Sequence, residues 1–241
     1  MANPSVYIET SIVSYLTARA SRDLVIAAHC QITQEWWEMR RADFTLYTAQ
    51  PVIKEASAGD AEMVAKRLAA LDGVPLLAVN QAANDLAKAL VTRGPIPPKA
   101  AVDALHIATA AVHGMIICSP GTVNISPTPK CKAPLRPDVG PPASNRRCFA
   151  LLKNYWEANI MIWKDEIVEE VRRVREEYAA RFGYDLDAIC RDLQEQEKQS
   201  SRRIVSFSPA IRAKRGSREK FLAAMSKVPD VEPEEYDRLP N

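Results

Sequence analysis

The sequence predicts an α/β fold with a parallel sheet flanked by helices, and two observations over residues 1–115 support it. Short runs of β-branched, aromatic and other apolar residues alternate with longer stretches in which apolar residues recur at helical spacing. One run, 74–79, is almost continuously apolar, as expected of a strand buried on both faces. Strands that alternate with helices favour a parallel sheet.

The expected elements follow in order along residues 1–115. Strands are predicted at residues 5–8, 44–47 and 74–79. Helices are predicted at residues 23–40, 60–71, 80–92 and 99–113. Asp60 and Asn80 are placed to begin two of these helices, where their side chains can accept hydrogen bonds from free backbone amides. The apolar residues of the first helix fall on one broad face: Leu24, Ala27, Ala28, Ile32, Trp36 and Met39.

Residues 116–160 depart from this pattern. Seven prolines fall between Pro120 and Pro142, and no helical or strand period is visible. Proline interrupts both helices and sheets, so such a stretch is ordinarily a linker or a disordered segment. However, it lacks the bias toward Glu, Lys and Ser that is typical of linkers.

A helical segment with a basic and then acidic tail occupies residues 161–241. The apolar residues of its first helix recur at helical spacing: Ile167, Val171, Val174 and Tyr178. A second helix, which Asp185 can cap, has three apolar residues on one face: Leu186, Ile189 and Leu193. We expect the apolar stripe of the first helix to need a partner, and its Glu and Arg residues to face solvent.

The composition of the chain argues against several kinds of protein. The net charge of +2 does not by itself indicate a nucleic-acid-binding protein. The five cysteines are scattered without CxxC spacing, so neither a zinc site nor a disulfide framework is indicated. No apolar run reaches about 18 residues, and the N-terminus has no signal-peptide pattern. We therefore expect no membrane association and a cytoplasmic location.

Three acids lie in apolar sequence surroundings. Glu9 directly follows the first strand, Glu55 lies in a short helical stretch, and Asp103 is almost the only charge on an apolar helix. A buried carboxylate without a partner is costly. Converging carboxylates become tolerable when a divalent cation lies among them, and oxygen-only ligands favour Mg²⁺ or Mn²⁺ over zinc.

Each acid also has an ordinary interpretation. An acid at a strand end, such as Glu9, is more often a helix cap or a surface charge. Lys54 and Asp60 suggest that Glu55 lies in an exposed turn. His106 either bonds Asp103 or is a half-buried core histidine, and the second interpretation is favoured.

Taken in order, the three acidic segments resemble the PIN-domain family, especially the VapC-like toxins of toxin–antitoxin pairs. VYIETS (6–11) resembles the first-acid motif, with Glu where Asp is commoner. PVIKEASAGDAEMVAKRL (51–68) resembles the second-acid segment, and AVDALHIATA (101–110) resembles the third-acid helix. The resemblance covers about residues 5–115, and its specificity lies in the order and spacing of the motifs.

This resemblance implies a metal-dependent endoribonuclease that hydrolyses RNA phosphodiester bonds. Glu9, Glu55 and Asp103 would be its catalytic residues and would hold Mg²⁺ or Mn²⁺. Thr10 and Ser11 would help to position the substrate. The implied partners are RNA, a cognate antitoxin protein and a second copy of the chain.

The resemblance stops at about Met115. The family continues with a final strand and a segment similar to DYLLTWN, whereas this chain reads IICSPGTVNISPTPK (116–130). Loss of one base after the Met115 codon explains the difference, because codons exist for residues 116–122 that read DYLLTWN once the base is restored. A family-like reading continues to Lys153 and explains the prolines, which arise where restored codons end in CC.

On this frameshift hypothesis, residues 116–160 are out of frame and Met161 begins a separate small helical protein. The PIN-like part, 1–115, would have lost a sheet strand, its closing helices and a fourth site position, so nuclease activity would be weak or absent. Two alternatives stay open. The α/β part could be a non-catalytic nucleic-acid- or protein-binding scaffold with a helical C-terminal partner module. Residues 116–160 could instead link a nuclease to regulatory helices.

Overall fold

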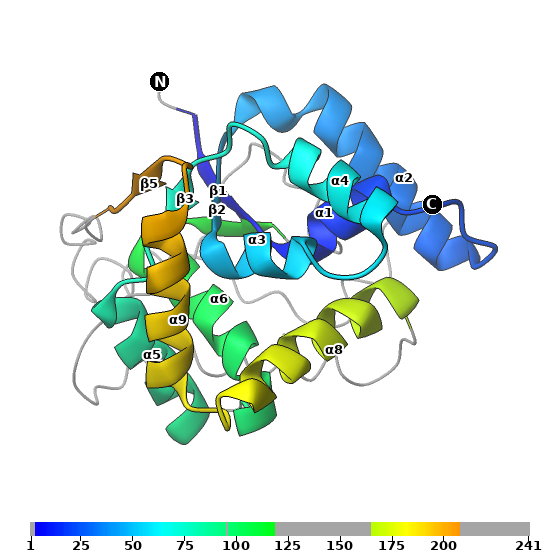
Figure 1. Ribbon diagram of the computed structural model, residues 1–241. Helices are drawn as coiled ribbons and strands as arrows, with labels where there is room; N and C mark the ends of the chain where they lie inside the picture. The colour runs from blue at the N-terminus through cyan, green and yellow to red at the C-terminus, as the bar shows by residue number, and fades with distance from the viewer. Residues whose placement is uncertain (1–2, 95, 119–164, 208–241) are drawn as a thin grey trace, which may run out of the picture. The chain divides into compact units, whose positions relative to one another are not determined.

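The computed structural model describes residues 3–94, 96–118 and 165–207 (Figure 1). Within these residues, the strands form one parallel sheet in the order β4-β1-β2-β3-β5. The strands are β1 (Ser5–Ile8), β2 (Thr45–Ala49), β3 (Leu76–Leu77), β4 (Ile116–Cys118) and β5 (Ile204–Val205). The predicted fold class, a parallel sheet flanked by helices, is confirmed.

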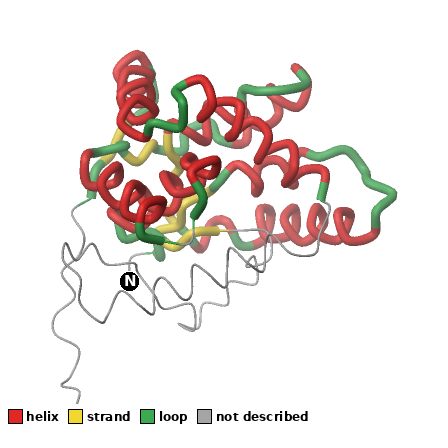
Figure 2. The backbone as a smooth tube through the Cα atoms, turned by 90° about the horizontal axis from the view of Figure 1, so that it is seen from below, coloured by secondary structure: helices red, strands yellow, loops and turns green. Residues whose placement is uncertain are grey.

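The helices lie between these strands in sequence and around them in space, as Figure 2 shows. They are α1 (Thr10–Thr17), α2 (Leu24–Met39), α3 (Gln50–Ala56), α4 (Ala61–Ala70), α5 (Gln81–Thr92), α6 (Ala101–Val112), α8 (Glu166–Arg181) and α9 (Leu186–Gln199), with short 3-10 turns η1 (Arg41–Asp43) and η2 (Pro98–Ala100). The predicted caps are confirmed: Asp60, Asn80 and Asp185 each accept a hydrogen bond from a backbone amide at the start of a helix. None of the described helices is long and apolar enough to cross a membrane.

Two large clusters of buried apolar side chains form the core. One joins β1 and β2 to α1, α2 and α3, with Tyr7 and Leu77 among its fully buried members. The other joins α5 and α6 to Tyr178 of α8 and to Ile189 and Leu193 of α9. The apolar face predicted for α9 therefore packs on the α5–α6 pair. The stripe predicted for α8 is divided, because Tyr178 joins this cluster whereas Ile167 packs against Tyr15 and Ile26 of α1 and α2. Helices α8 and α9 lie beside α6 and α5 (Figure 1).

Residues 116–118 form β4 beside β1, so the expected loss of a sheet strand after Met115 is wrong. Val6, Tyr7 and Ile8 pair with Ile116, Ile117 and Cys118 in turn. Residues 116–118 are two β-branched isoleucines and an apolar cysteine, which suit a strand. The Pro-rich segment and Met161 lie outside the described residues.

The strand within the apolar run 74–79 has a neighbouring strand on each side. β3 is shorter than predicted and lies between β2 and β5. The amides of Leu76 and Ala78 donate to the carbonyl oxygens of Arg203 at 2.8 Å and Val205 at 2.9 Å. Thus the C-terminal segment covers this sheet edge with a strand of its own.

Helix α9 adds polar contacts next to β3. Glu197 Oε1 accepts from the Val79 amide at 2.8 Å, and Gln194 Nε2 donates to the Val79 carbonyl at 2.7 Å. Asp187 accepts from Asn84 Nδ2 at 2.6 Å, and its carboxylate also pairs with a lysine of α5. The segment 165–207 therefore joins residues 3–118 through a strand, two packed helices and buried polar bonds.

Candidate functional site

The three acids singled out from the sequence come from three elements that meet near the carboxyl ends of β1 and β2. Glu9 directly follows β1 and precedes α1. Glu55 lies in α3, which begins immediately after β2. Asp103 lies in the first turn of α6. Because β1 and β2 are neighbouring parallel strands, their carboxyl ends lie at the same end of the sheet, which is where sites form in such folds.

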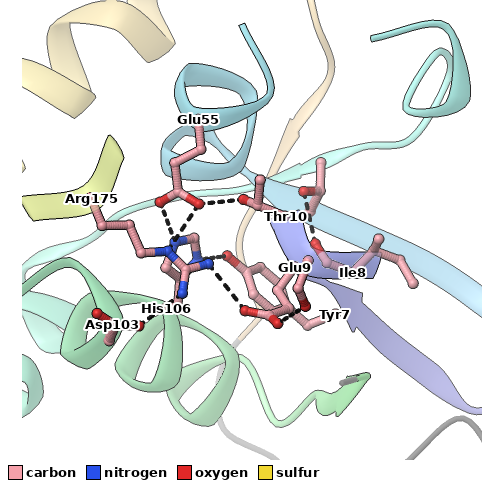
Figure 3. Close-up of polar contacts among 10 residues, drawn as sticks. Tyr7, Ile8, Glu9, Thr10, Glu55, Asp103, His106 and Arg175 are labelled. Atoms are coloured by element: carbon pink, nitrogen blue, oxygen red, sulfur yellow. Dashed lines mark hydrogen bonds and ion pairs between the residues drawn. The ribbon is translucent and has the colours of Figure 1, made fainter. Parts of the chain in front are cut away.

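The side chain of Arg175, from α8, lies between the three carboxylates (Figure 3). Its Nε donates to Glu55 Oε2 at 3.0 Å, its Nη1 to Asp103 Oδ1 at 2.8 Å and its Nη2 to Glu9 Oε2 at 3.1 Å. Each guanidinium nitrogen thus has a different carboxylate. The side chain of Arg175 is only 8% exposed, so solvent screens these ion pairs little.

Charge in this cluster is not balanced by Arg175. Three carboxylates against one guanidinium leave a formal excess of two negative charges. Burial alone would raise the pKa of Glu55, but Arg175, and then His106 and Thr10, outweigh burial and lower that pKa to about 2. Burial alone would lower the pKa of Arg175, yet the three carboxylates hold it well above its usual value. Glu55 and Arg175 are therefore both charged at neutral pH.

Two hydroxyl groups from the first turn of α1 hold the acids in place. Thr10 Oγ1 donates to Glu55 Oε2, and Ser11 Oγ donates to Glu9 Oε1. Both residues are buried. The structure therefore places the two residues expected at the substrate directly against the carboxylates, where they orient the cluster.

Two of the ordinary interpretations are corrected by the geometry. Glu55 is buried, not on an exposed turn, because it is three residues after buried Val52 and shares the inner face of α3. His106 is almost fully buried and does not bond Asp103. Instead, its Nε2 lies 2.7 Å from Glu55 Oε1 and its Nδ1 lies 2.7 Å from the hydroxyl of Tyr7.

The carboxylates suit a hard divalent cation in chemistry and in charge. As they stand, no group of three or more His, Cys, Asp or Glu side chains in the described parts of the chain is arranged to hold a metal ion. Arg175 occupies the space between the three acids, and its fork of donors holds one carboxylate at each nitrogen. The cluster therefore fits such an ion only with Arg175 moved aside.

The sequence analysis does not identify Arg175 as a site residue, because it lies in a run of Glu and Arg residues that is typical of a solvent-exposed helix face. A signal was nevertheless present. Val171, Arg175 and Tyr178 have the four- and three-residue spacing of a buried stripe, and all three are buried. A cation on the apolar stripe of a helix requires a buried anionic partner.

Comparison of this chain with protein-family models, with curated proteins and with solved structures finds no match in any of the three. The chain's fold and its carboxylate cluster are therefore the basis for an assignment of function.

Proposed function

We propose that residues 3–118 form a PIN-type, metal-dependent endoribonuclease domain in which Glu9, Glu55 and Asp103 hold Mg²⁺ or Mn²⁺. We also propose that the chain is inhibited as it stands, because Arg175 occupies the place of the cation. One observation carries both proposals: acids from three separate elements converge on a single guanidinium.

The number of acids is the reason to favour a cation site over a structural ion pair. One carboxylate suffices to pair with Arg175, and each further carboxylate, here partly buried, adds desolvation cost and repulsion. With Arg175 the formal excess is two negative charges, since three carboxylates face one guanidinium. A divalent cation in the same place would reduce that excess to one.

The proposed chemistry divides between the ion and the chain. A bound divalent cation would activate water and stabilise charge on a phosphodiester transition state. Glu9, Glu55 and Asp103 would supply oxygen ligands, and Thr10 and Ser11 would keep two of them oriented through the hydroxyl bonds described above.

Two features lead us to expect weak or absent cleavage by the chain as it stands. Arg175 binds an oxygen of each carboxylate. In addition, the fourth site position implied by the family resemblance falls after Met115, where the sequence departs from the family.

We propose that the segment 165–207 acts as a cognate antitoxin would, as an inhibitor joined here to the domain it blocks. Its buried ion pairs, packed helices and added strand are contacts typical of peptide and protein recognition. Resequencing the DNA around the Met115 codon tests the origin of this arrangement. A restored base would make the segment part of a separate partner protein, and an unchanged reading would make it an internal inhibitor.

The central experiment compares the full-length chain with its Arg175→Gln variant. Calorimetric titration with Mn²⁺ should show uptake by the variant and not by the parent, and RNA cleavage with Mg²⁺ should increase in parallel. Asp103→Asn in the variant should abolish both. Arg173→Gln is the matched control, since Arg173 lies on the same helix with its side chain 60% exposed and pairs with Glu177 one turn further along. A folded Arg175→Gln chain that takes up no Mn²⁺ would contradict the nuclease proposal.

A second candidate function is a non-catalytic binding scaffold. The observation in its favour is that every carboxylate of the cluster already has a buried cationic partner, so the cluster can serve as an anchor for 165–207. The same titration separates the two functions, because a scaffold would lose stability when Arg175 is replaced and would gain no metal affinity.

A further inference from the structure

A buried row of hydrogen bonds connects Tyr7, His106 and Glu55 (Figure 3). The Tyr7 hydroxyl lies 2.7 Å from His106 Nδ1, and His106 Nε2 lies 2.7 Å from Glu55 Oε1. Strand β1, helix α6 and helix α3 each provide one member. All three residues are at most 5% exposed, so water does not compete for these bonds.

The ionised Glu55 fixes the donor in one of these two hydrogen bonds. An ionised carboxylate only accepts, so His106 Nε2 must carry a proton. In the tautomer that carries its only ring proton on Nε2, Nδ1 accepts from the Tyr7 hydroxyl. Burial, followed by the nearby charge of Glu55, raises the pKa of Tyr7 well above its usual value, so the phenol keeps the proton that it donates.

The two oxygens of Glu55 consequently have different roles. Oε1 accepts from His106, whereas Oε2 accepts from Arg175 Nε at 3.0 Å and from Thr10. Anchoring at Oε1 fixes the rotation of the carboxylate about its own axis. Oε2 is thereby held toward the guanidinium, which is the position of the cation in the proposed function.

We propose that His106, oriented by Tyr7, is the positioning residue for Glu55: it holds Oε1 and presents Oε2 to the cation in the cluster. The inference rests on the proposed function and adds to it the residue that orients one of its ligands. Partners that orient a metal ligand in this way typically change metal affinity by about 10- to 100-fold when they are removed.

The test compares two variants of similar side-chain size in the full-length Arg175→Gln chain. In His106→Gln, the amide nitrogen can still donate to Glu55, whereas in His106→Leu nothing can. Mn²⁺ affinity should fall at least about tenfold in His106→Leu and stay within about threefold of the parent in His106→Gln. A role in packing alone predicts the opposite order, because leucine suits an apolar surrounding better than glutamine. Equal affinities, or higher affinity in the leucine variant, would overturn the proposal.

A second measurement does not depend on metal binding. In the wild-type chain with ¹⁵N-labelled histidine, the ring nitrogens of His106 should report a protonated Nε2 and an unprotonated Nδ1. Tyr7→Phe removes the donor to Nδ1 while keeping the aromatic ring, and it should shift the Nδ1 resonance. The opposite tautomer in the wild-type chain would overturn the proposal, whatever the metal titration gives.

The Mn²⁺ titration tests the nuclease proposal, and urea unfolding can test the role of His106 separately. If the Arg175→Gln parent takes up no Mn²⁺, the nuclease proposal is wrong, and the positioning role is judged with Arg175 itself as the cation. In the Arg175-containing chain, His106→Leu should then unfold at clearly lower urea concentration than His106→Gln. Equal midpoints for the two variants would overturn the positioning role as well.

Discussion

Arg175 Nε lies 3.0 Å from Glu55 Oε2, although the two residues are 120 positions apart in the sequence. The pair joins α8 to α3, and both side chains are less than a tenth exposed. Glu9 and Asp103 contact the other two nitrogens of the same guanidinium. The stability of the fold and the state of the candidate site therefore depend on one side chain, since moving Arg175 leaves three like charges facing one another.

Replacement of Arg175 by methionine should destabilise the chain strongly. The variant keeps most of the apolar stem but leaves three carboxylates without their cation, and breaking a buried pair typically costs about 3–5 kcal/mol. Urea unfolding at pH 7 measures the difference. Arg173→Met, on the exposed side of the same helix, should change stability by no more than about 0.5 kcal/mol. Similar losses in both variants would mean that the cluster contributes little to folding.

Acid should weaken the chain through Glu55. The pKa of this carboxyl is lowered from 4.5 to about 2 in the folded chain, so its contribution is complete above pH 4.5 and is lost as the pH falls toward 2. The contribution is on the order of 3 kcal/mol. Urea unfolding of the wild type across this window should show a falling stability, and Glu55→Gln should show a shallower fall. Identical slopes would assign the acid sensitivity to other carboxylates.

The parts of the fold that the sequence predicts are those that short-range patterns determine. Strand-like and helix-like periods alternate over residues 1–115, and the caps Asp60, Asn80 and Asp185 lie where short-range hydrogen bonding places them. That Glu9 and Glu55 approach one another follows from topology, because each comes after the end of a neighbouring parallel strand.

The parts that were not predictable depend on packing between distant segments. Nothing local assigns Arg175 to Glu55, or β5 to the edge of β3, because each contact is between the C-terminal segment and residues of the N-terminal part. Helix α2 shows the same limit. Of its proposed apolar face, Trp36 is buried, but Leu24, Ile32 and Met39 are exposed. The buried side instead includes Ile26, Cys30 and Thr33, which were not part of the proposed face. When apolar residues lie on both sides of a helix, the sequence does not predict which side packs against the core.

Substitution of Glu197 by glutamine should leave the chain as stable as the wild type or stabilise it by up to about 1 kcal/mol. The carboxylate is buried on α9, and its Oε1 accepts from the Val79 amide at 2.8 Å. Burial raises the pKa of Glu197, so its charged form is unfavourable in the fold at neutral pH. Glutamine keeps the carbonyl oxygen and removes the charge.

Glu197→Ala is the comparison for this substitution, since it leaves the Val79 amide without its acceptor and should cost about 1–3 kcal/mol. Urea unfolding at pH 7 ranks the three chains. The difference between glutamine and wild type should shrink as the pH falls, because Glu197 then becomes protonated. If glutamine is as harmful as alanine, the charge itself stabilises the fold.

The stability of the pairing between β5 and β3 should depend on Phe207. Its amide donates to His113 Nδ1 at 3.0 Å, and its ring lies edge-on to Tyr47 with centroids 5.2 Å apart. Phe207→Ala removes the ring contacts, which are worth about 0.5–1.5 kcal/mol beyond the buried area. The Leu76 and Ala78 amides, which donate to Arg203 and Val205, should then exchange with solvent roughly tenfold faster.

Hydrogen exchange read out by NMR measures these two amides against that of Tyr7 in β1, which should not change. Met39→Ala is the control substitution, because the side chain of Met39 lies on the solvent side of α2 and is 67% exposed. Unchanged exchange at Leu76 and Ala78 in Phe207→Ala would mean that the ring of Phe207 does not keep β5 in place. Faster exchange would show that the edge strand has its own anchor, separate from the carboxylate cluster.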